Sequence, residues 1–255
     1  MRPALLAPLL ALLTATACFT TVPSSGLSLE AFDLQATVDE TRGGRVRVSV
    51  TLNHCGVSWE RITLAGTDRL EASLDGETIE LSPPIFSLGG TYEGIFPRGT
   101  ESGEVSMVLL RTPGSRARPG ATVMMPAKVR ITSPARREPV SRGTEDLAVR
   151  WSPLRGEDEG SLGADRAAWE VRGAEACSSE DQAPDFRGDL ELGRRDDGFV
   201  LPAGTLALPA LSGSGSCKSE LVVLRSNVGL VDEGFCGDSS IRAERVSARV
   251  FKSTP

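Results

Sequence analysis

Histidine-based catalysis in this chain would have to use His54, because the 255 residues include one histidine. Cys55 follows it directly, so the pair first suggests a cysteine nucleophile with a histidine base. The two residues come at the end of an alternating run, Val46–Leu52, that predicts a strand, and adjacent residues there point in opposite directions. Because a thiolate and its base must lie side by side, we interpret His54 as an ordinary loop residue and predict no catalytic residues.

The spacing of the cysteine, histidine and acidic residues does not predict a metal site or a catalytic pair of carboxylates. The cysteines are scattered without a CxxC pair, and no HxxxH spacing exists. Acidic clusters at Glu157–Glu159 and Asp196-Asp197 invite a calcium site, but GEDEG lacks the alternating acids of an EF-hand loop. No motif singles out a glycosidase pair among the 34 acidic residues. We therefore predict a protein that is not an enzyme and that holds no metal and no cofactor.

The amino terminus has the parts of a secretory signal. Arg2 precedes an apolar run, Ala4–Leu13, which is shorter than the roughly 20 residues that span a bilayer. Ala15-Thr16-Ala17 supplies a small-residue cleavage pattern, and Cys18 follows it directly. This arrangement resembles a bacterial lipobox, so we predict a signal peptide over 1–17 and lipidation of Cys18. The usual lipobox has leucine where this chain has Ala15, so cleavage by the general signal peptidase, with Cys18 unmodified, stays the alternative.

The residues after Cys18 bear on location and partners. Phe19, rather than an aspartate, follows the cysteine, and the resemblance to bacterial lipoproteins then implies the outer membrane rather than the inner membrane. The segment Thr20–Gly26 contains a proline and two serines, so we predict a short flexible tether over 18–26. The formal net charge of -6 argues against nucleic acid as a partner. We expect contact with the membrane through the lipid, and with an unknown envelope protein.

Four further cysteines, Cys55, Cys177, Cys217 and Cys236, form an even set suited to disulfides in an oxidising compartment. We prefer a Cys177–Cys217 bridge, because both residues flank predicted strands of one domain. Cys55 and Cys236 would then pair across domains or stay free. Four cysteines allow three pairings, and all three stay open at this point.

Alternation of apolar and polar residues predicts an all-β fold. Phe32–Val38 and Val46–Leu52 alternate on either side of the turn-forming stretch DETRGG and predict a hairpin. LEASLDGETIEL predicts a second hairpin, whose Asp75-Gly76 pair tolerates the positive φ values of a tight turn. Further strands are expected at KVRITSP, LAVRWSP, Tyr92–Phe96, Val105–Leu110, Trp169–Arg172, Asp189–Leu192, Phe199–Leu201, Leu221–Leu224 and Val246–Phe251.

The chain divides at TPGSRARPGATVMMP, which is rich in proline and glycine and ends at residue 126. We predict two tandem immunoglobulin-like or fibronectin-like β-sandwich domains, an N-terminal domain over 27–126 and a C-terminal domain over 127–255. The halves share a short echo, because VSMVLLRT and ELVVLRSN each close an apolar strand with an arginine and a hydroxyl residue. These arginines are Arg111 and Arg225.

Aromatic residues make up 5% of the chain, which leaves few platforms for sugar binding. Trp151 and Trp169 lie on alternating runs and are expected in the core. Trp59 and Tyr92 are the aromatic residues that we expect to be available for a binding surface.

The C-terminal half contains KVRITSP, VSRGTEDLAVRWSP, FVLPAGTLAL, LVVLRSNVGLVDEGF and VSARVFKSTP. With these segments, roughly residues 121–255 resemble a group of predicted bacterial lipoproteins, typical of myxobacteria, that carry an immunoglobulin-like β-sandwich. The resemblance implies a periplasmic or surface protein of uncharacterised role and supplies no catalytic residues. We therefore expect a lipid-anchored envelope protein that presents β-sandwich domains for protein contact or envelope structure. The alternative is a ligand-binding module for a glycan or a metal ion.

Overall fold

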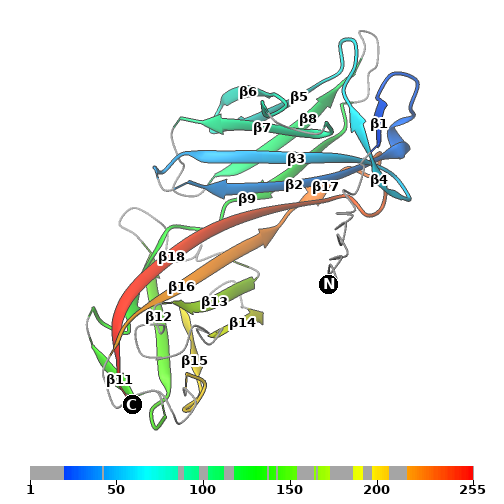
Figure 1. Ribbon diagram of the computed structural model, residues 1–255. Coiled ribbons are helices and arrows are strands. Elements are labelled where there is room, and N and C mark those ends of the chain that lie inside the picture. The colour runs from blue at the N-terminus through cyan, green and yellow to red at the C-terminus, as the bar shows by residue number, and fades with distance from the viewer. Residues whose placement is uncertain are drawn as a thin grey trace, which may run out of the picture.

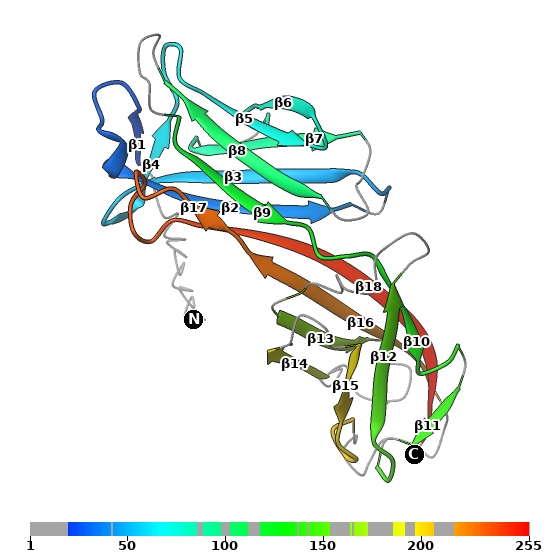
Figure 2. The same ribbon diagram turned by 180° about the vertical axis from the view of Figure 1, so that it is seen from behind.

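The computed structural model describes residues 20–41, 43–85, 89–97, 103–111, 118–136, 138–141, 143–153, 164, 166–172, 186–191, 197–206 and 217–254. These residues form strands and one short 3-10 helix, η1 (Leu29–Ala31), so the predicted all-β class is confirmed. Figures 1 and 2 show two lobes, joined by two long strands that run through both.

The first lobe is a sandwich of two sheets. One sheet has the order β1 (Thr20–Pro23), β4 (Val57–Thr63), β3 (Val46–His54) and β2 (Phe32–Glu40), with β7 (Thr91–Phe96) paired to β3. The other sheet has the order β17 (Leu230–Val231), β9 (Gly120–Met124), β8 (Glu104–Leu110), β5 (Arg69–Leu74) and β6 (Glu77–Leu81).

The predicted hairpins of the first lobe are confirmed. Strands β2 and β3 pair in antiparallel register from Phe32↔His54 to Glu40↔Val46. Their alternate apolar residues face the core, as the period of two required. Asp75 (φ 52°) and Gly76 (φ 83°) form the turn between β5 and β6 with positive φ at both positions. The buried residues of the hairpin are Phe32, Leu34, Ala36, Val38, Val46, Val48, Val50 and Leu52.

The second lobe packs a sheet of β10 (Val129–Ser133), β12 (Leu147–Pro153) and β15 (Gly198–Leu201) against a larger sheet. The larger sheet contains β14 (Phe186–Glu191), β13 (Arg166–Arg172), β16 (Cys217–Val228) and the C-terminal part of β18 (Ser240–Thr254), with β11 (Pro139–Ser141) at the end of β18. It continues through β18 into the sheet of β1, β4, β3 and β2 in the first lobe, so the two form one ten-stranded sheet. Trp151 and Trp169 are buried in the core between these sheets, which confirms their predicted position.

The long strands β16 and β18 form a continuous antiparallel ribbon, paired from Cys217↔Ser253 to Val228↔Arg242. The first residues of β18, Ser240–Glu244, also pair in parallel with β2, and β17 pairs with β9. The chain therefore leaves the first lobe between β9 and β10 and returns to it after β16. The range 127–255 thus contains strands of both lobes (Figure 1).

Buried arginines hold the connection between β9 and β10 against the ribbon. The Arg225 guanidinium donates a hydrogen bond to the carbonyl of Ala127, and that of Arg245 donates to the carbonyl of Pro126. Arg245 also pairs with Glu40 at the end of β2, with 2.8 Å between Nε and Oε2. Arg225 is 0% and Arg245 is 3% exposed, so these contacts are shielded from water and couple the two lobes.

The sequence echo between Arg111 and Arg225 has a structural counterpart. The Arg111 guanidinium lies 5.1 Å from the ring centroid of Phe32, and that of Arg225 lies 6.0 Å from the ring of Trp151. Each guanidinium also donates to backbone carbonyls of the segment that precedes the first core strand of its lobe. Each lobe thus has a guanidinium that lies near a core aromatic ring and binds the segment before a core strand.

Candidate functional site

Two of the predicted cysteines form a disulfide. Cys55, in the turn after β3, is bonded to Cys236, in the loop between β17 and β18, with an S–S distance of 2.01 Å. Pairing was one of the two outcomes left open for these cysteines, and both lie in the first lobe. Cys18, Cys177 and the side chain of Cys217 lie outside the described residues, so lipidation and the preferred Cys177–Cys217 bridge stay predictions.

The disulfide rules out the simplest nucleophilic site. The sulfur of Cys55 is bonded to Cys236, so it offers no thiolate to the neighbouring His54. The imidazole of His54 instead meets a carboxylate of β4, with 2.9 Å between Nδ1 and Oε2 of Glu60. Both side chains are partly exposed at the end of the first lobe. Within the described part of the chain, this arrangement gives the histidine a carboxylate partner rather than a nucleophile.

The two aromatic residues expected at the surface differ. Trp59 on β4 is 60% exposed, as predicted. Tyr92 on β7 is 5% exposed, so its predicted availability for binding is wrong. Its ring packs in the core while its hydroxyl accepts a hydrogen bond from the Leu64 N–H at 2.6 Å. Burial raises the pKa of Tyr92, and the bond from the Leu64 backbone opposes this shift.

The acidic clusters do not come together as a described metal site. Glu157–Glu159 and Asp196 lie outside the described residues. Asp197 accepts a hydrogen bond from Arg150 at 2.8 Å, on an exposed edge of the second lobe. Among the described residues, no three His, Cys, Asp or Glu side chains are placed to hold a metal ion. The described part also contains no helix that is long and apolar enough to cross a membrane.

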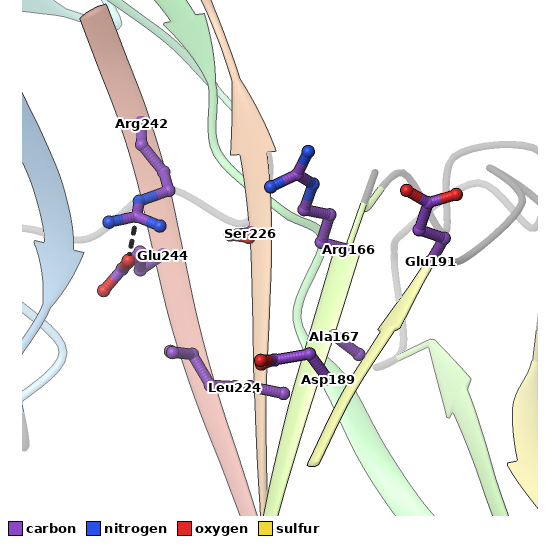
Figure 3. A pocket seen from close by; sticks show the side chains of 9 residues that line it. Arg166, Ala167, Asp189, Glu191, Leu224, Ser226, Arg242 and Glu244 are labelled. Atoms are coloured by element: carbon purple, nitrogen blue, oxygen red, sulfur yellow. Dashed lines mark ion pairs between the residues drawn. The ribbon is translucent and has the colours of Figure 1, made fainter.

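A groove of about 420 Å³ crosses the face of β14, β13, β16 and β18 (Figure 3). Arg166 and Arg242 line it together with Asp189, Glu191 and Glu244. Arg242 and Glu244 form an ion pair at 2.9 Å, drawn as a dashed line in Figure 3. Because both signs of charge alternate along the groove, it matches a mixed-charge protein surface better than an ion of one sign. We call it the ribbon groove.

A second groove, of about 600 Å³, lies where the lobes meet. Its polar residues include Glu40 and Lys128, which form an ion pair with 3.0 Å between Oε1 and Nζ. Its apolar part includes Val246, which is exposed on β18. This junction groove therefore combines a neutralised charge pair with apolar surface, and it is large enough for a small ligand.

The chain between β1 and η1 is held to the body of the first lobe. Ser24 is buried, its hydroxyl donates to Asp68 at 2.8 Å, and its backbone N–H donates to the Thr63 carbonyl at 2.8 Å. The Arg111 guanidinium pairs with Asp68 at 3.3 Å and donates to the carbonyls of Ser24 and Leu27. We call Ser24, Asp68 and Arg111 the N-terminal clamp.

The clamp corrects the prediction of a flexible tether over 18–26. Within that range the described residues start at Thr20, and Thr20–Pro23 form β1, which pairs in parallel with β4. The segment 18–26 resembled a linker because of its proline and serines. Strand β4 nevertheless supplies backbone hydrogen-bond partners for β1, and the clamp supplies side-chain partners for Ser24. A fixed connection thus begins two residues after Cys18.

No protein-family model and no curated protein matches this sequence. Among solved structures, a segment of two fibronectin type-III domains from chicken tenascin is 12% identical with a TM-score of 0.23, covering 84% of this chain and 96% of the segment. The adhesin InvE of Yersinia pseudotuberculosis is 12% identical with a TM-score of 0.24, covering 88% of this chain and 60% of that chain. The FN1–FN3 domains of chicken CNTN1 are 12% identical with a TM-score of 0.21, covering 88% and 66%. This chain spans less than two thirds of the latter two, and we infer no function from similarity at this level.

Proposed function

We propose that the chain is a non-enzymatic, lipid-anchored protein of the bacterial envelope, held in the outer rather than the inner membrane. It presents a stiff two-lobed β body for contact with an envelope protein or for envelope structure. The observation that carries this proposal is the continuous ribbon of β16 and β18, which runs through both lobes. Such a body holds its surfaces at a set distance and orientation from its attachment point.

The buried junction supports the stiffness that this role needs. Tandem sandwiches joined by a single linker move relative to each other by default. Here, the ribbon, the parallel pairing of β18 with β2 and the arginine contacts to Pro126 and Ala127 join the lobes at three places. Contact surfaces carried by strands and short loops therefore keep their relative geometry.

Fractionation of the Cys18→Ser variant tests the anchor. Lipidated cysteines hold a protein at a bilayer through more than one acyl chain, each buried methylene adding about 0.8 kcal/mol. The variant should therefore move from the membrane to the soluble envelope fraction and lose the mass of the acyl chains. Unchanged membrane retention with no acyl mass on the wild-type Cys18 would refute the anchor.

Site-specific cross-linking tests the protein contact. The ribbon groove is the candidate contact surface, because its alternating charges suit another protein. A photo-reactive residue at Glu191 in the groove should give a discrete adduct in intact envelopes. The matched position is Glu80, exposed on β6 at the edge of the other sheet of the first lobe, where we expect no adduct. Equal labelling at both positions would show that the groove is not a contact site.

The junction groove favours the second candidate function, a ligand-binding module for a glycan or a metal ion. Its volume of about 600 Å³ and its mixed polar and apolar lining fit a small ligand. Calorimetric titration with envelope glycans and with calcium measures this directly. Saturable heat that disappears in Lys128→Met would favour this candidate over protein contact.

A further inference from the structure

The indole of Trp59 is the large aromatic surface that the described part of the chain exposes. Trp59 is 60% exposed, whereas Trp151 and Trp169 are buried in the second lobe. The other exposed large apolar residues are aliphatic, namely Ile85, Ile95, Met124, Val200, Val228, Leu230 and Val246. An indole combines an apolar ring with a polar N–H, a combination that is enriched at the interface between a bilayer and water.

Trp59 lies beside the start of the described chain. Strand β1 pairs in parallel with β4, and Thr20 is opposite Glu60, the residue after Trp59. Ile62 on the same strand is buried and faces the core. The side chain of Trp59 is 60% exposed, so it points into solvent and away from the core that Ile62 enters. The exposed indole and the first residue of β1 therefore occupy one end of the first lobe.

The distance from Cys18 to this end is short. Thr20 lies two residue steps after Cys18, with Phe19 between them, and two steps of extended chain reach at most about 7 Å. Adding about 5 Å between paired strands and one step along β4 places the Trp59 backbone within roughly 15 Å of Cys18. The N-terminal clamp fixes the residues directly after β1 to the first lobe. The distance between Cys18 and Trp59 is therefore limited by Cys18–Thr20 alone. The polar zone of a bilayer is about 5–8 Å thick on each side, so the indole is within reach of it.

We propose that Trp59 inserts its indole into the headgroup region of the bilayer that holds the acyl chains of Cys18. The first lobe then rests on the lipid surface through two points, the acyl chains and the indole. This inference rests on the proposed function, because the acylated cysteine brings the lobe to the membrane. The lipid surface it fits is zwitterionic, since the chain's formal charge of -6 is repelled by anionic headgroups.

Fluorescence quenching by brominated lipids tests the contact. The acylated full-length chain, purified from a bacterial host, is reconstituted into phosphatidylcholine vesicles with or without bromine on the acyl-chain carbons nearest the headgroup, where the proposed indole position lies. Bromine quenches an indole that it can touch, so we expect the loss of up to about one third of the emission, because Trp59 is one of three tryptophans. Trp59→Ala should abolish this loss, and the emission of the buried Trp151 and Trp169 serves as an internal control.

A lengthened connection is the matched control. Insertion of a flexible Gly-Ser linker of several residues between Phe19 and Thr20 lets the lobe move away from the membrane while the acyl chains stay in place. Quenching should then fall well below that of the wild type, although vesicle binding is retained. Undiminished quenching in this variant would show that the short connection does not bring Trp59 to the lipid.

Mass spectrometry of the same sample separates this inference from the proposed function. If Cys18 is acylated and the protein binds vesicles but Trp59 is unquenched, this inference is overturned and the anchor stands. If Cys18 carries no acyl chain, the proposed function fails and the inference fails with it. Equal quenching in the wild type and in Trp59→Ala would also overturn the inference, because the quenched emission would then come from the other tryptophans.

Discussion

Removing the Cys55–Cys236 disulfide should destabilise the protein and release a specific segment. The bridge joins residues 181 apart in the sequence, so it closes a long loop of the unfolded chain. The chain-entropy relation assigns about 5 kcal/mol to a loop of this length, and measured losses of native bridges are about 2–5 kcal/mol. For a chain of this size, a loss of about 2–5 kcal/mol lowers Tm by roughly 4–20 °C.

The double variant Cys55→Ser/Cys236→Ser isolates this effect, because it leaves neither residue as a free thiol. Denaturant unfolding should give a free energy about 3–5 kcal/mol below that of the wild type. The loss of stability should differ between parts of the chain. Cys236 holds the loop between β17 and β18 to the first lobe, through the disulfide and through its backbone N–H, which donates to the Phe32 carbonyl. Hydrogen exchange should therefore rise most in β17 and in residues 240–244 of β18, and little in the second lobe.

Two results would refute this reasoning. A free energy of unfolding within about 1 kcal/mol of the wild type would mean that the bridge does not constrain the unfolded chain as assumed. Uniform loss of protection over both lobes would mean that the segment after β16 is not held locally by the bridge.

Three further predictions follow from single side chains. Arg245→Met removes one of the two cations that pair with Glu40 and the donor to the buried Pro126 carbonyl, so it should cost about 1–3 kcal/mol in denaturant unfolding; a cost under about 0.5 kcal/mol would contradict it. Gly229→Ala would bring a Cβ within 2.0 Å of the Thr122 carbonyl oxygen and should cost about 1–3 kcal/mol, whereas Gly143→Ala, with open space around it, should be close to neutral. The raised pKa of Tyr92 means that the folded state holds the phenolic proton more tightly than the unfolded state. The contribution of Tyr92 to stability should therefore be constant below about pH 10 and be lost as pH rises through the folded pKa, and Tyr92→Phe should remove this loss. Tyrosinate absorbance of the single tyrosine reports the titration, and ionisation at the ordinary pKa would contradict it.

Local sequence patterns predicted the elements whose conformation depends mainly on neighbouring residues. The hairpin of β2 and β3 followed from alternation, because a strand with one buried face must repeat every two residues. The Asp75-Gly76 turn followed from the backbone conformations that these two residues tolerate. Tyr92 was misjudged because a phenol can lie in the core if its hydroxyl finds a partner, and the partner is a backbone N–H 28 residues away.

The segment after Cys18 shows what local sequence patterns could not predict. Thr20–Gly26 has the composition of a linker, and nothing in that composition shows that β4 pairs with it. The predicted strands also omitted β4 and β9, so the partners of β1 and β17 were missing from the sequence reading. The one signal that pointed to the clamp was the repeated arginine at the end of an apolar strand, at Arg111 and Arg225.

The sequence by itself determined the all-β class, the hairpins with their turns and the burial of Trp151 and Trp169. Each of these follows from the alternation or turn chemistry of a few neighbouring residues. Only the tertiary structure decided that β18 returns to pair with β2 and that Cys55 meets Cys236. It also decided that β1 is fixed beside Trp59. These contacts join residues that are far apart in the chain, and their free energy depends on which surfaces meet, which no local pattern encodes.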